Sequence, residues 1–318
     1  MYLLEFVGDD DAFARREAAS RATDVELLAP GVGTARGVER AETLAYTRRV
    51  CRLVGTCEPE IAAAVAVVRA AGIDRIGTVA VRCRDVRGRS DVDTQAAERR
   101  LGRVLVDRGF DVDLEAPDHT LVGLFSEGTA ALGWLETETV RDFAARKPTE
   151  KPFFQPGSMA PMDARALANI AGAGPETRLL DPMCGTGGVL VEAGLAGSAV
   201  VGVDAQRKMA AGAERNLREY LDRGSVVLGD GTRLPFAEGR FDGVVFDAPY
   251  GRQSKIEGDS LEALVGDALE EAHRVGSRCV LVADRSWASR ATAAGWRVTD
   301  RFERRVHRSL VRHVHVLE

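Results

Sequence analysis

Residues 246–251, FDAPYG, follow an apolar run and combine an acid, a rigid turn and an aromatic ring. One interpretation is structural, because Asp, Pro and Gly are common turn formers where a strand ends. The other is chemical. The carboxylate of Asp247 and the backbone carbonyl of Ala248 can accept the two N–H groups of an exocyclic amine. Pro249 would fix the turn, and Tyr250 would stack on the base that carries the amine.

A glycine-rich loop, LLDPMCGTGG, follows another apolar run and is typical of ligand binding between a strand and a helix. The dinucleotide fingerprint G-x-G-x-x-G fails here, because its third glycine would fall at Leu190. The carboxylate of Asp181 would also repel a pyrophosphate. The loop therefore favours a ligand with a positive group and no phosphate, and S-adenosylmethionine has a sulfonium, an ammonium and an adenosine.

The next two apolar runs also end in aspartate. Asp204, 23 residues after Asp181, is placed to accept both ribose hydroxyls. Asp230 is placed to accept the adenine amine, with Gly231 beside the ring. Each aspartate alone is more simply a helix N-cap. Three in this order favour a methyl-donor site, in which Gly185 and Gly187 allow close backbone approach.

The fourth strand end is then the place where a methyl acceptor meets the donor. An exocyclic amine is a poor nucleophile, because its lone pair is delocalised into the ring. If Asp247 and the Ala248 carbonyl accept its N–H groups, the nitrogen is drawn toward tetrahedral geometry. This context favours the chemical interpretation of FDAPYG over the turn.

The elements that must position these residues alternate regularly. Strands expected within 177–183, 199–205, 225–231, 241–249 and 278–284 are short apolar runs separated by helical patterns, which predicts a parallel sheet covered on both faces. Residues 297–318 form two extended segments and predict a terminal antiparallel hairpin. Upstream, we expect a strand, a helix, extended segments around Pro30, a strand over 76–86, a helix over 93–109 and a hairpin over 119–134.

The composition limits the class of protein. The chain has 318 residues, of which 45% are hydrophobic, and a net charge of −5, so a nucleic-acid surface must be a local patch. No apolar run approaches the roughly 20 residues that span a bilayer. Five cysteines without a C-x-x-C pair argue against a disulfide scaffold and a zinc site. We expect a cytoplasmic monomer with no metal and no membrane association.

The motifs DPMCGTGG, GVDA, GDGT and DAPYG resemble those of Rossmann-like amino-methyltransferases with a D/N-P-P-Y signature. Residues 153–161, FFQPGSMAP, resemble the segment that closes over the cofactor in the RNA-modifying branch. Residues 112–134 resemble the end of a THUMP domain, and the tail resembles the final hairpin of archaeal tRNA guanosine-10 N2-methyltransferases. One departure is Ala248, where the family usually has a second proline; the backbone carbonyl survives that change.

The resemblance implies an α/β fold: a Rossmann-like class I methyltransferase domain, with a mostly parallel seven-stranded sheet and a terminal antiparallel hairpin, preceded by an α+β ferredoxin-like/THUMP region. The implied domains are 1–50 (ferredoxin-like), 51–146 (THUMP, RNA-binding), 147–157 (linker, in a proline-rich stretch) and 158–318 (methyltransferase). The implied cofactor is S-adenosylmethionine. The resemblance implies that the cofactor contacts the acids and glycines named above. It also implies five further contacts: Phe154, Pro156, Gly157, Cys184 and Thr186.

The implied partner is tRNA, and the implied products are N2-methylguanosine and N2,N2-dimethylguanosine. Arg82, Arg84 and Arg87 alternate along the predicted strand and its loop, where they can contact phosphates or simply be solvated. Arg252 and Gln253 follow FDAPYG and are further candidates for RNA contact. Alternatives are a guanosine N2-methyltransferase for another tRNA or rRNA position, an adenine-N6 enzyme, and a non-catalytic RNA-binding protein with a degenerate methyltransferase fold.

Overall fold

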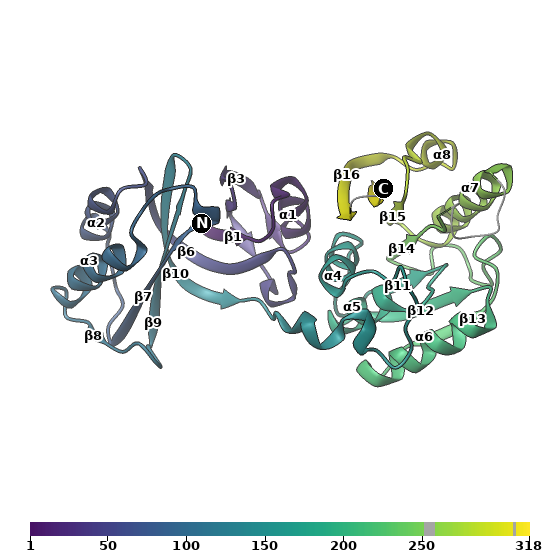
Figure 1. Ribbon diagram of the computed structural model, residues 1–318, viewed down its shortest axis with the longest axis horizontal. Coiled ribbons are helices and arrows are strands. Elements are labelled where there is room, and N and C mark those ends of the chain that lie inside the picture. The colour runs from purple at the N-terminus through teal and green to yellow at the C-terminus, as the bar shows by residue number, and fades with distance from the viewer. Residues whose placement is uncertain (251–257, 308–309) are drawn as a thin grey trace. The chain divides into compact units, whose positions relative to one another are not determined.

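The apolar segments predicted as strands form two separate main sheets, one in each of two units of the chain. The computed structural model describes residues 1–250, 258–307 and 310–318, hereafter the described residues (Figure 1). The two units are Met1–Val140 and Arg141–Glu318. No helix among the described residues is long and apolar enough to cross a membrane.

The first unit, as far as it is described, is built on an eight-stranded sheet in the order β3-β4-β1-β6-β10-β9-β7-β8. Its strands are β1 (Tyr2–Phe6), β3 (Glu26–Ala29), β4 (Val32–Ala35), β6 (Thr47–Cys57), β7 (Thr78–Asp85), β8 (Asp111–Val112), β9 (His119–Ser126) and β10 (Thr129–Glu138). A small separate ribbon joins β2 (Ala22–Thr23) to β5 (Gly37–Val38). Its α-helices are α1 (Asp11–Ala18), α2 (Ile61–Ala70) and α3 (Thr94–Val106).

Local sequence signals explain several of these elements. The Asp93 side chain caps α3 by accepting a hydrogen bond from the Ala96 amide at 2.9 Å. Gly109, at φ +93, lies in the left-handed region just after α3 ends. The predicted hairpin over 119–134 is confirmed, because β9 and β10 pair antiparallel from Ser126 and Thr129.

One core of the first unit lies between the sheet and the helices α2 and α3, where Val68, Leu101 and Phe125 are fully buried. The predicted boundary between residues 50 and 51 falls inside β6, which pairs with both β1 and β10. Residues 1–140 therefore form one compact unit. The assignment of its halves to ferredoxin-like and THUMP domains stays a prediction.

The second unit, over its described residues, is built on a seven-stranded sheet in the order β13-β12-β11-β14-β15-β17-β16. Its strands are β11 (Arg178–Asp181), β12 (Ala199–Asp204), β13 (Ser225–Leu228), β14 (Gly243–Asp247), β15 (Cys279–Ala283), β16 (Val298–His307) and β17 (Leu310–Leu317). The first five pair in parallel, and β17 pairs antiparallel with β15 and β16. The predicted parallel sheet with a terminal antiparallel hairpin is confirmed.

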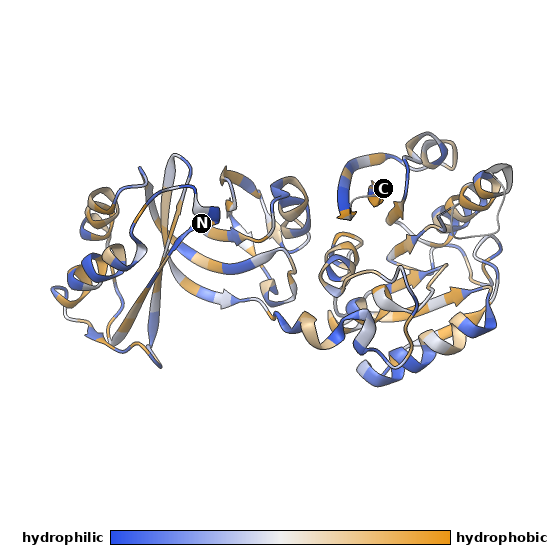
Figure 2. Ribbon diagram, viewed as in Figure 1, coloured by the Kyte–Doolittle hydropathy of each residue, from blue (hydrophilic) through white to orange (hydrophobic). Residues whose placement is uncertain are grey.

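Helices cover both faces of this sheet, which explains the continuous apolar runs of its inner strands. In Figure 2 the strands of the second unit are largely orange, which marks hydrophobic residues. The helix α6 carries blue segments, which mark hydrophilic residues. The core joins Leu180, Phe246 and Leu281 of the strands to Val265 and Leu269 of one helix. The α-helices of this unit are α4 (Pro161–Ile170), α5 (Gly188–Leu195), α6 (Arg207–Tyr220), α7 (Gly258–Val275) and α8 (Ala288–Ala293).

The proline-rich segment predicted as a linker, 147–157, belongs to the second unit and packs within it. Lys151 is buried, and the Phe153 amide donates to the Asn216 side chain at 2.8 Å. A buried ion pair precedes the segment, since Arg146 Nε lies 2.7 Å from an oxygen of the fully buried Glu192. This packing positions the segment near the glycine-rich loop.

Candidate active site

Four aspartates lie at or just beyond the carboxyl ends of neighbouring parallel strands. Asp181, Asp204 and Asp247 are the last residues of β11, β12 and β14. Asp230 lies two residues beyond β13. Because the carboxyl ends of parallel strands meet at one edge of a sheet, this edge is where a ligand site of the fold is expected.

The glycine-rich loop after β11 is held by backbone hydrogen bonds. The Cys184 amide donates to Val203 O at 2.9 Å, and the Gly185 amide donates to Oδ2 of Asp204 at 2.9 Å. Gly185 has φ +53, and a Cβ on it would meet nothing within 4 Å. Gly187, at φ +73, is the N-cap of α5. The loop therefore needs glycine for its backbone conformation, and at Gly185 it leaves open space.

Residues 153–158 are tied to this loop by Asn216, a fully buried side chain of α6. Asn216 Oδ1 accepts from the Phe153 amide at 2.8 Å, and its Nδ2 donates to Phe153 O and to Thr186 O, both at 2.8 Å. The Phe153 ring fills the space beside Gly212, where a Cβ would lie 2.0 Å from it. Ser158 Oγ lies 3.2 Å from Thr186 Oγ1. Asn216 therefore positions the segment against the loop.

The segment, the loop and the end of β14 enclose a cavity of about 330 Å³. It is lined by residues from 155–159, 181–189 and 247–250, together with Met209 and Leu310. The Asp181 carboxylate, 3% exposed, forms one wall and accepts a hydrogen bond from the Met183 amide at 3.1 Å. Among the described residues, no cationic side chain forms an ion pair with Asp181. A buried acid of this kind suits a positively charged ligand.

Asp247, Ala248, Pro249 and Tyr250, at the end of the neighbouring strand β14, form another wall of the cavity. The Tyr250 hydroxyl donates to Oδ1 of Asp247 at 2.7 Å. Arg312, from β17, donates to the same hydroxyl at 3.0 Å, and its Nη2 lies 3.6 Å from Oδ2 of Asp247. The Ala248 amide donates to Val282 O at 2.8 Å, which fixes the peptide whose carbonyl was predicted to accept an amine.

The acids at this edge differ in their electrostatics. Burial raises the pKa of Asp181 well above its usual range, and the nearby Asp204 and Asp247 add to that rise. Burial also raises the pKa of Asp247 to about 6, although the charge of Arg312 and the hydrogen bond from Tyr250 oppose the rise. Hydrogen bonds from Thr232 lower the pKa of the exposed Asp230.

The cavity therefore brings together most of the residues predicted from the sequence, and a few lie outside its walls. Those that line it are Pro156, Gly157, Asp181, Cys184, Gly185, Thr186 and the four residues 247–250. Those that do not are Phe154, Gly187, Asp204, Asp230 and Gly231. Phe154 is 43% exposed. The Asp204 carboxylate is engaged by the amides of Gly185 and Gln206. The roles predicted for all of these residues stay predictions.

Sequence reasoning missed Asn216 and Arg312. Asn216 lies between Ala213 and Leu217 on the buried face of α6, and a polar residue on an apolar helix face is a signal that could have identified it. Arg312 lies in a hairpin with charged residues at many positions, so no local pattern distinguishes it. In the described part of the chain, no group of three or more His, Cys, Asp or Glu residues is arranged to hold a metal ion.

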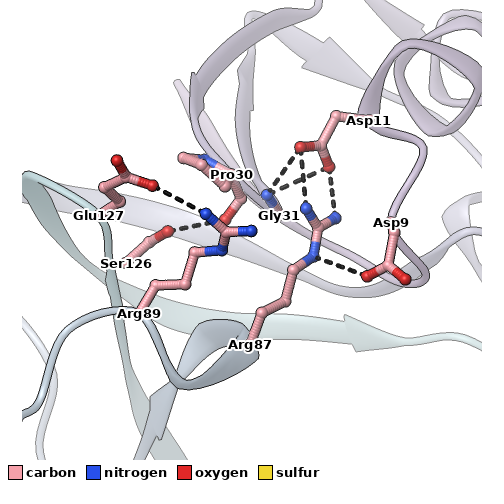
Figure 3. Close-up of polar contacts among 8 residues, drawn as sticks. All are labelled: Asp9, Asp11, Pro30, Gly31, Arg87, Arg89, Ser126 and Glu127. Carbon is pink, nitrogen blue, oxygen red and sulfur yellow. Dashed lines mark hydrogen bonds and ion pairs between the residues drawn. The ribbon is translucent and has the colours of Figure 1, made fainter.

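Three of the arginines predicted to contact RNA lie in the first unit and are already engaged. Arg84 pairs with Glu5 at 3.0 Å. Both terminal nitrogens of Arg87 donate to Asp11, at 3.0 and 2.5 Å, and Figure 3 shows them facing its carboxylate. Arg82 instead donates to the backbone carbonyls of Val81 and Leu114. The other two candidates, Arg252 and Gln253, lie outside the described residues.

Comparison with known proteins gives consistent matches. Residues 148–313 match the protein family described as RMKL-like, methyltransferase domain. A tRNA (guanine(10)-N2)-dimethyltransferase of Methanothermobacter thermautotrophicus is 35% identical over 247 residues, which are 75% of this chain and 72% of that protein. A protein of the same name from Pyrococcus abyssi is 33% identical over 249 residues, 76% of this chain and 74% of its own length.

A solved structure extends the comparison to the whole chain. TrmN from Thermus thermophilus superimposes with a TM-score of 0.52 at 24% identity, covering 100% of this chain and 99% of its own. That likeness shows the fold of the two units.

Proposed function

The chain belongs to the family of archaeal tRNA (guanine(10)-N2)-dimethyltransferases, and from this membership we propose that it methylates the exocyclic N2 amine of guanosine 10 in tRNA. The methyl donor is S-adenosylmethionine, and the products are N2-methylguanosine and N2,N2-dimethylguanosine. The observation that supports this function best is the cavity that joins the buried Asp181, the open backbone at Gly185 and the end of β14.

The residues of the cavity fit such a donor. Its volume of about 330 Å³ lies at the lower end of the range for ligand pockets. The buried Asp181 carboxylate would pair with a positive group of the donor, and Gly185 would allow close approach of the backbone. Asp204 and Asp230 would accept the ribose hydroxyls and the adenine amine from the edge of the same sheet. When bound, S-adenosylmethionine supplies an electrophilic methyl group.

The end of β14 orients the acceptor. The Ala248 carbonyl and the Asp247 carboxylate would accept the two N–H groups of the guanine amine. Tyr250 donates to Oδ1 of Asp247 at 2.7 Å, whereas among the described residues Oδ2 has only the longer contact of 3.6 Å with Arg312, so Oδ2 would accept the N–H of the amine. With its pKa raised to about 6, Asp247 is also suited to accept the proton that the amine loses when the C–N bond forms. The ring of Tyr250 would stack on the flipped guanine.

The first unit is proposed to bind the tRNA and to set the distance to the target base. A site that holds one base has little surface for a whole tRNA, and arginine–phosphate contacts can position such a substrate. We propose that the protein acts as a cytoplasmic monomer. Its five cysteines are all free, as expected for a reducing compartment.

Nucleoside analysis of tRNA tests the function. Unmodified tRNA is incubated with methyl-labelled S-adenosylmethionine and either the wild-type protein or the Asp247→Ala variant. We expect N2-methylated guanosine with the wild type, and a turnover lower by at least about 100-fold in the variant, with donor affinity nearly unchanged. N6-methyladenosine as the product, or normal turnover in Asp247→Ala, would contradict the proposal.

A further inference from the structure

Arg312 is a buried cation that contacts two of the walls of the cavity, the segment with Gly157 and the end of β14. The residue is 6% exposed, and its Nε donates to the Tyr250 hydroxyl at 3.0 Å. Its Nη2 donates to Gly157 O at 3.2 Å and lies 3.6 Å from Oδ2 of Asp247. Gly157 belongs to the segment clamped by Asn216, and Asp247 and Tyr250 belong to the acceptor wall. One guanidinium therefore joins three groups from two walls.

The sheet topology explains how Arg312 reaches Asp247 although β17 and β14 are not neighbours. Between them lies β15, whose last residue, Ala283, pairs with His313. Arg312 therefore lies one residue beyond the end of β15, where no strand separates it from the end of β14. Arg304 lies directly opposite Arg312 on β16, but it pairs with Asp163 at 3.0 Å.

Resting on the function proposed above, we propose that Arg312 is a positioning residue for methyl transfer. Its guanidinium orients the Asp247 carboxylate, directly and through the Tyr250 hydroxyl, and ties that wall to Gly157. A guanidinium suits this task because its fork of N–H donors contacts several acceptors at once, whereas a lysine ammonium is a point charge.

Arg312 also affects methyl transfer through the ionisation of Asp247. Asp247 can take the proton that the amine loses only when it is ionised, and burial favours the neutral acid. Among the described residues, the charged and titratable groups that act on the pKa of Asp247 are Arg312 of β17, Tyr250 of its own loop and Asp284 after β15. Asp181, at the end of β11, is the neighbour whose own pKa Asp247 raises. Arg312 is the cation of this set, and it lowers the pKa of Asp247 while Asp284 raises it.

The test is the rate of a single methylation turnover on tRNA as a function of pH. Arg312→Met removes the charge and keeps the stem. The pKa of Asp247 then rises, so the ionised fraction falls at neutral pH and recovers toward about pH 9. We expect the acidic limb of the profile to move up by about one pH unit or more, and the plateau at high pH to stay about tenfold below the wild type, because the positioning contacts are lost as well as the charge.

Two further variants separate charge from geometry. Arg312→Lys keeps the charge, so we expect the acidic limb to stay near its wild-type position while the rate falls about tenfold at every pH. Arg304→Met is the matched control. It removes the guanidinium of the residue that faces Arg312 in the same hairpin, and that guanidinium pairs with Asp163. We expect it to leave the position of the acidic limb unchanged. Thermal melting and the affinity for S-adenosylhomocysteine establish that each variant is folded.

The outcomes distinguish this inference from the function on which it rests. A wild-type protein that binds S-adenosylhomocysteine but forms no N2-methylguanosine would overturn the proposed function. An active wild type with an Arg312→Met variant of unchanged rate and pH profile would overturn the role of Arg312 alone. If Arg312→Met does not fold, Arg312→Lys decides, and a wild-type rate in that variant would overturn the role equally.

Discussion

The Tyr250 hydroxyl donates a 2.7 Å hydrogen bond to Oδ1 of Asp247, three residues upstream. The sequence suggested only a stacking role for this tyrosine. The hydrogen bond gives it a second one, because it fixes the orientation of the carboxylate and opposes the effect of burial on its charge. The aromatic face and the hydroxyl of Tyr250 can therefore be tested separately.

Tyr250→Phe keeps the ring and removes the hydrogen bond. The bond lowers the pKa of Asp247, so its loss raises that pKa. As the pH is lowered, the variant should therefore lose activity at a higher pH than the wild type does. We expect the turnover near pH 7 to fall by about tenfold, as for a lost hydrogen bond to a charged group of roughly 1.5 kcal/mol. Tyr220→Phe, at the end of α6, is the matched control. Equal pH profiles for Tyr250→Phe and the wild type would contradict the role of the hydroxyl.

Donor binding is expected to depend on Asp181. In the free protein, burial raises the pKa of Asp181 well above its usual range. A bound cation favours the ionised form, so binding releases a proton wherever Asp181 is protonated, and affinity weakens as the pH falls. Calorimetry of S-adenosylmethionine binding in buffers of different ionisation enthalpy measures this release. The Asp181→Asn variant reports the contribution of all other groups, and an identical proton release in that variant would rule the assignment out.

The clamp at Asn216 is testable in the same way. Asn216→Ala leaves the part-buried amide and carbonyl of Phe153 and the carbonyl of Thr186 without this partner, which we expect to lower the free energy of unfolding by roughly 1–3 kcal/mol. Affinity for S-adenosylhomocysteine should fall as well, because residues 155–159 line the cavity. Arg215→Ala, on the exposed side of α6, is the control. Donor affinity equal to that of the control would mean that the segment does not depend on Asn216.

The structure ranks the arginines proposed to contact tRNA. Arg84 and Arg87 pair with Glu5 and Asp11, whereas the hydrogen bonds of Arg82 among the described residues go to backbone carbonyls. Arg82→Ala should therefore weaken tRNA binding and reduce the slope of log affinity against log salt by about one. Arg87→Ala should change that slope little. The reverse ranking in binding measurements across a salt series would show that Arg87 leaves Asp11 to contact a phosphate.

The second unit could be predicted closely from its sequence, because its five parallel strands are short apolar runs, and β11, β12 and β14 each end in an aspartate. The site residues within such local motifs, such as Asp181 and Asp247, were identifiable for the same reason. Arg312 could not be identified in this way, because its proposed role depends on where β15 ends. The pairing of strands in the sheet sets that position, and no local sequence pattern shows it. The strand β6 was missed because its arginines interrupt the apolar alternation, although it is central to its sheet. The helix α2 was missed as well, because its sequence is apolar nearly throughout and lacks the polar face that marks helical periodicity.

The measurement that tests the account most directly compares two tRNA substrates that differ at position 10 alone. One carries guanosine, and the other carries inosine, which lacks the exocyclic N2 amine but keeps the rest of the base. With labelled S-adenosylmethionine and the wild-type protein, we predict methylation of the guanosine-10 tRNA, recovered as N2-methylguanosine and N2,N2-dimethylguanosine, and background incorporation with the inosine-10 tRNA. Comparable incorporation into both substrates would contradict the claim that the end of β14 presents this amine to the methyl donor.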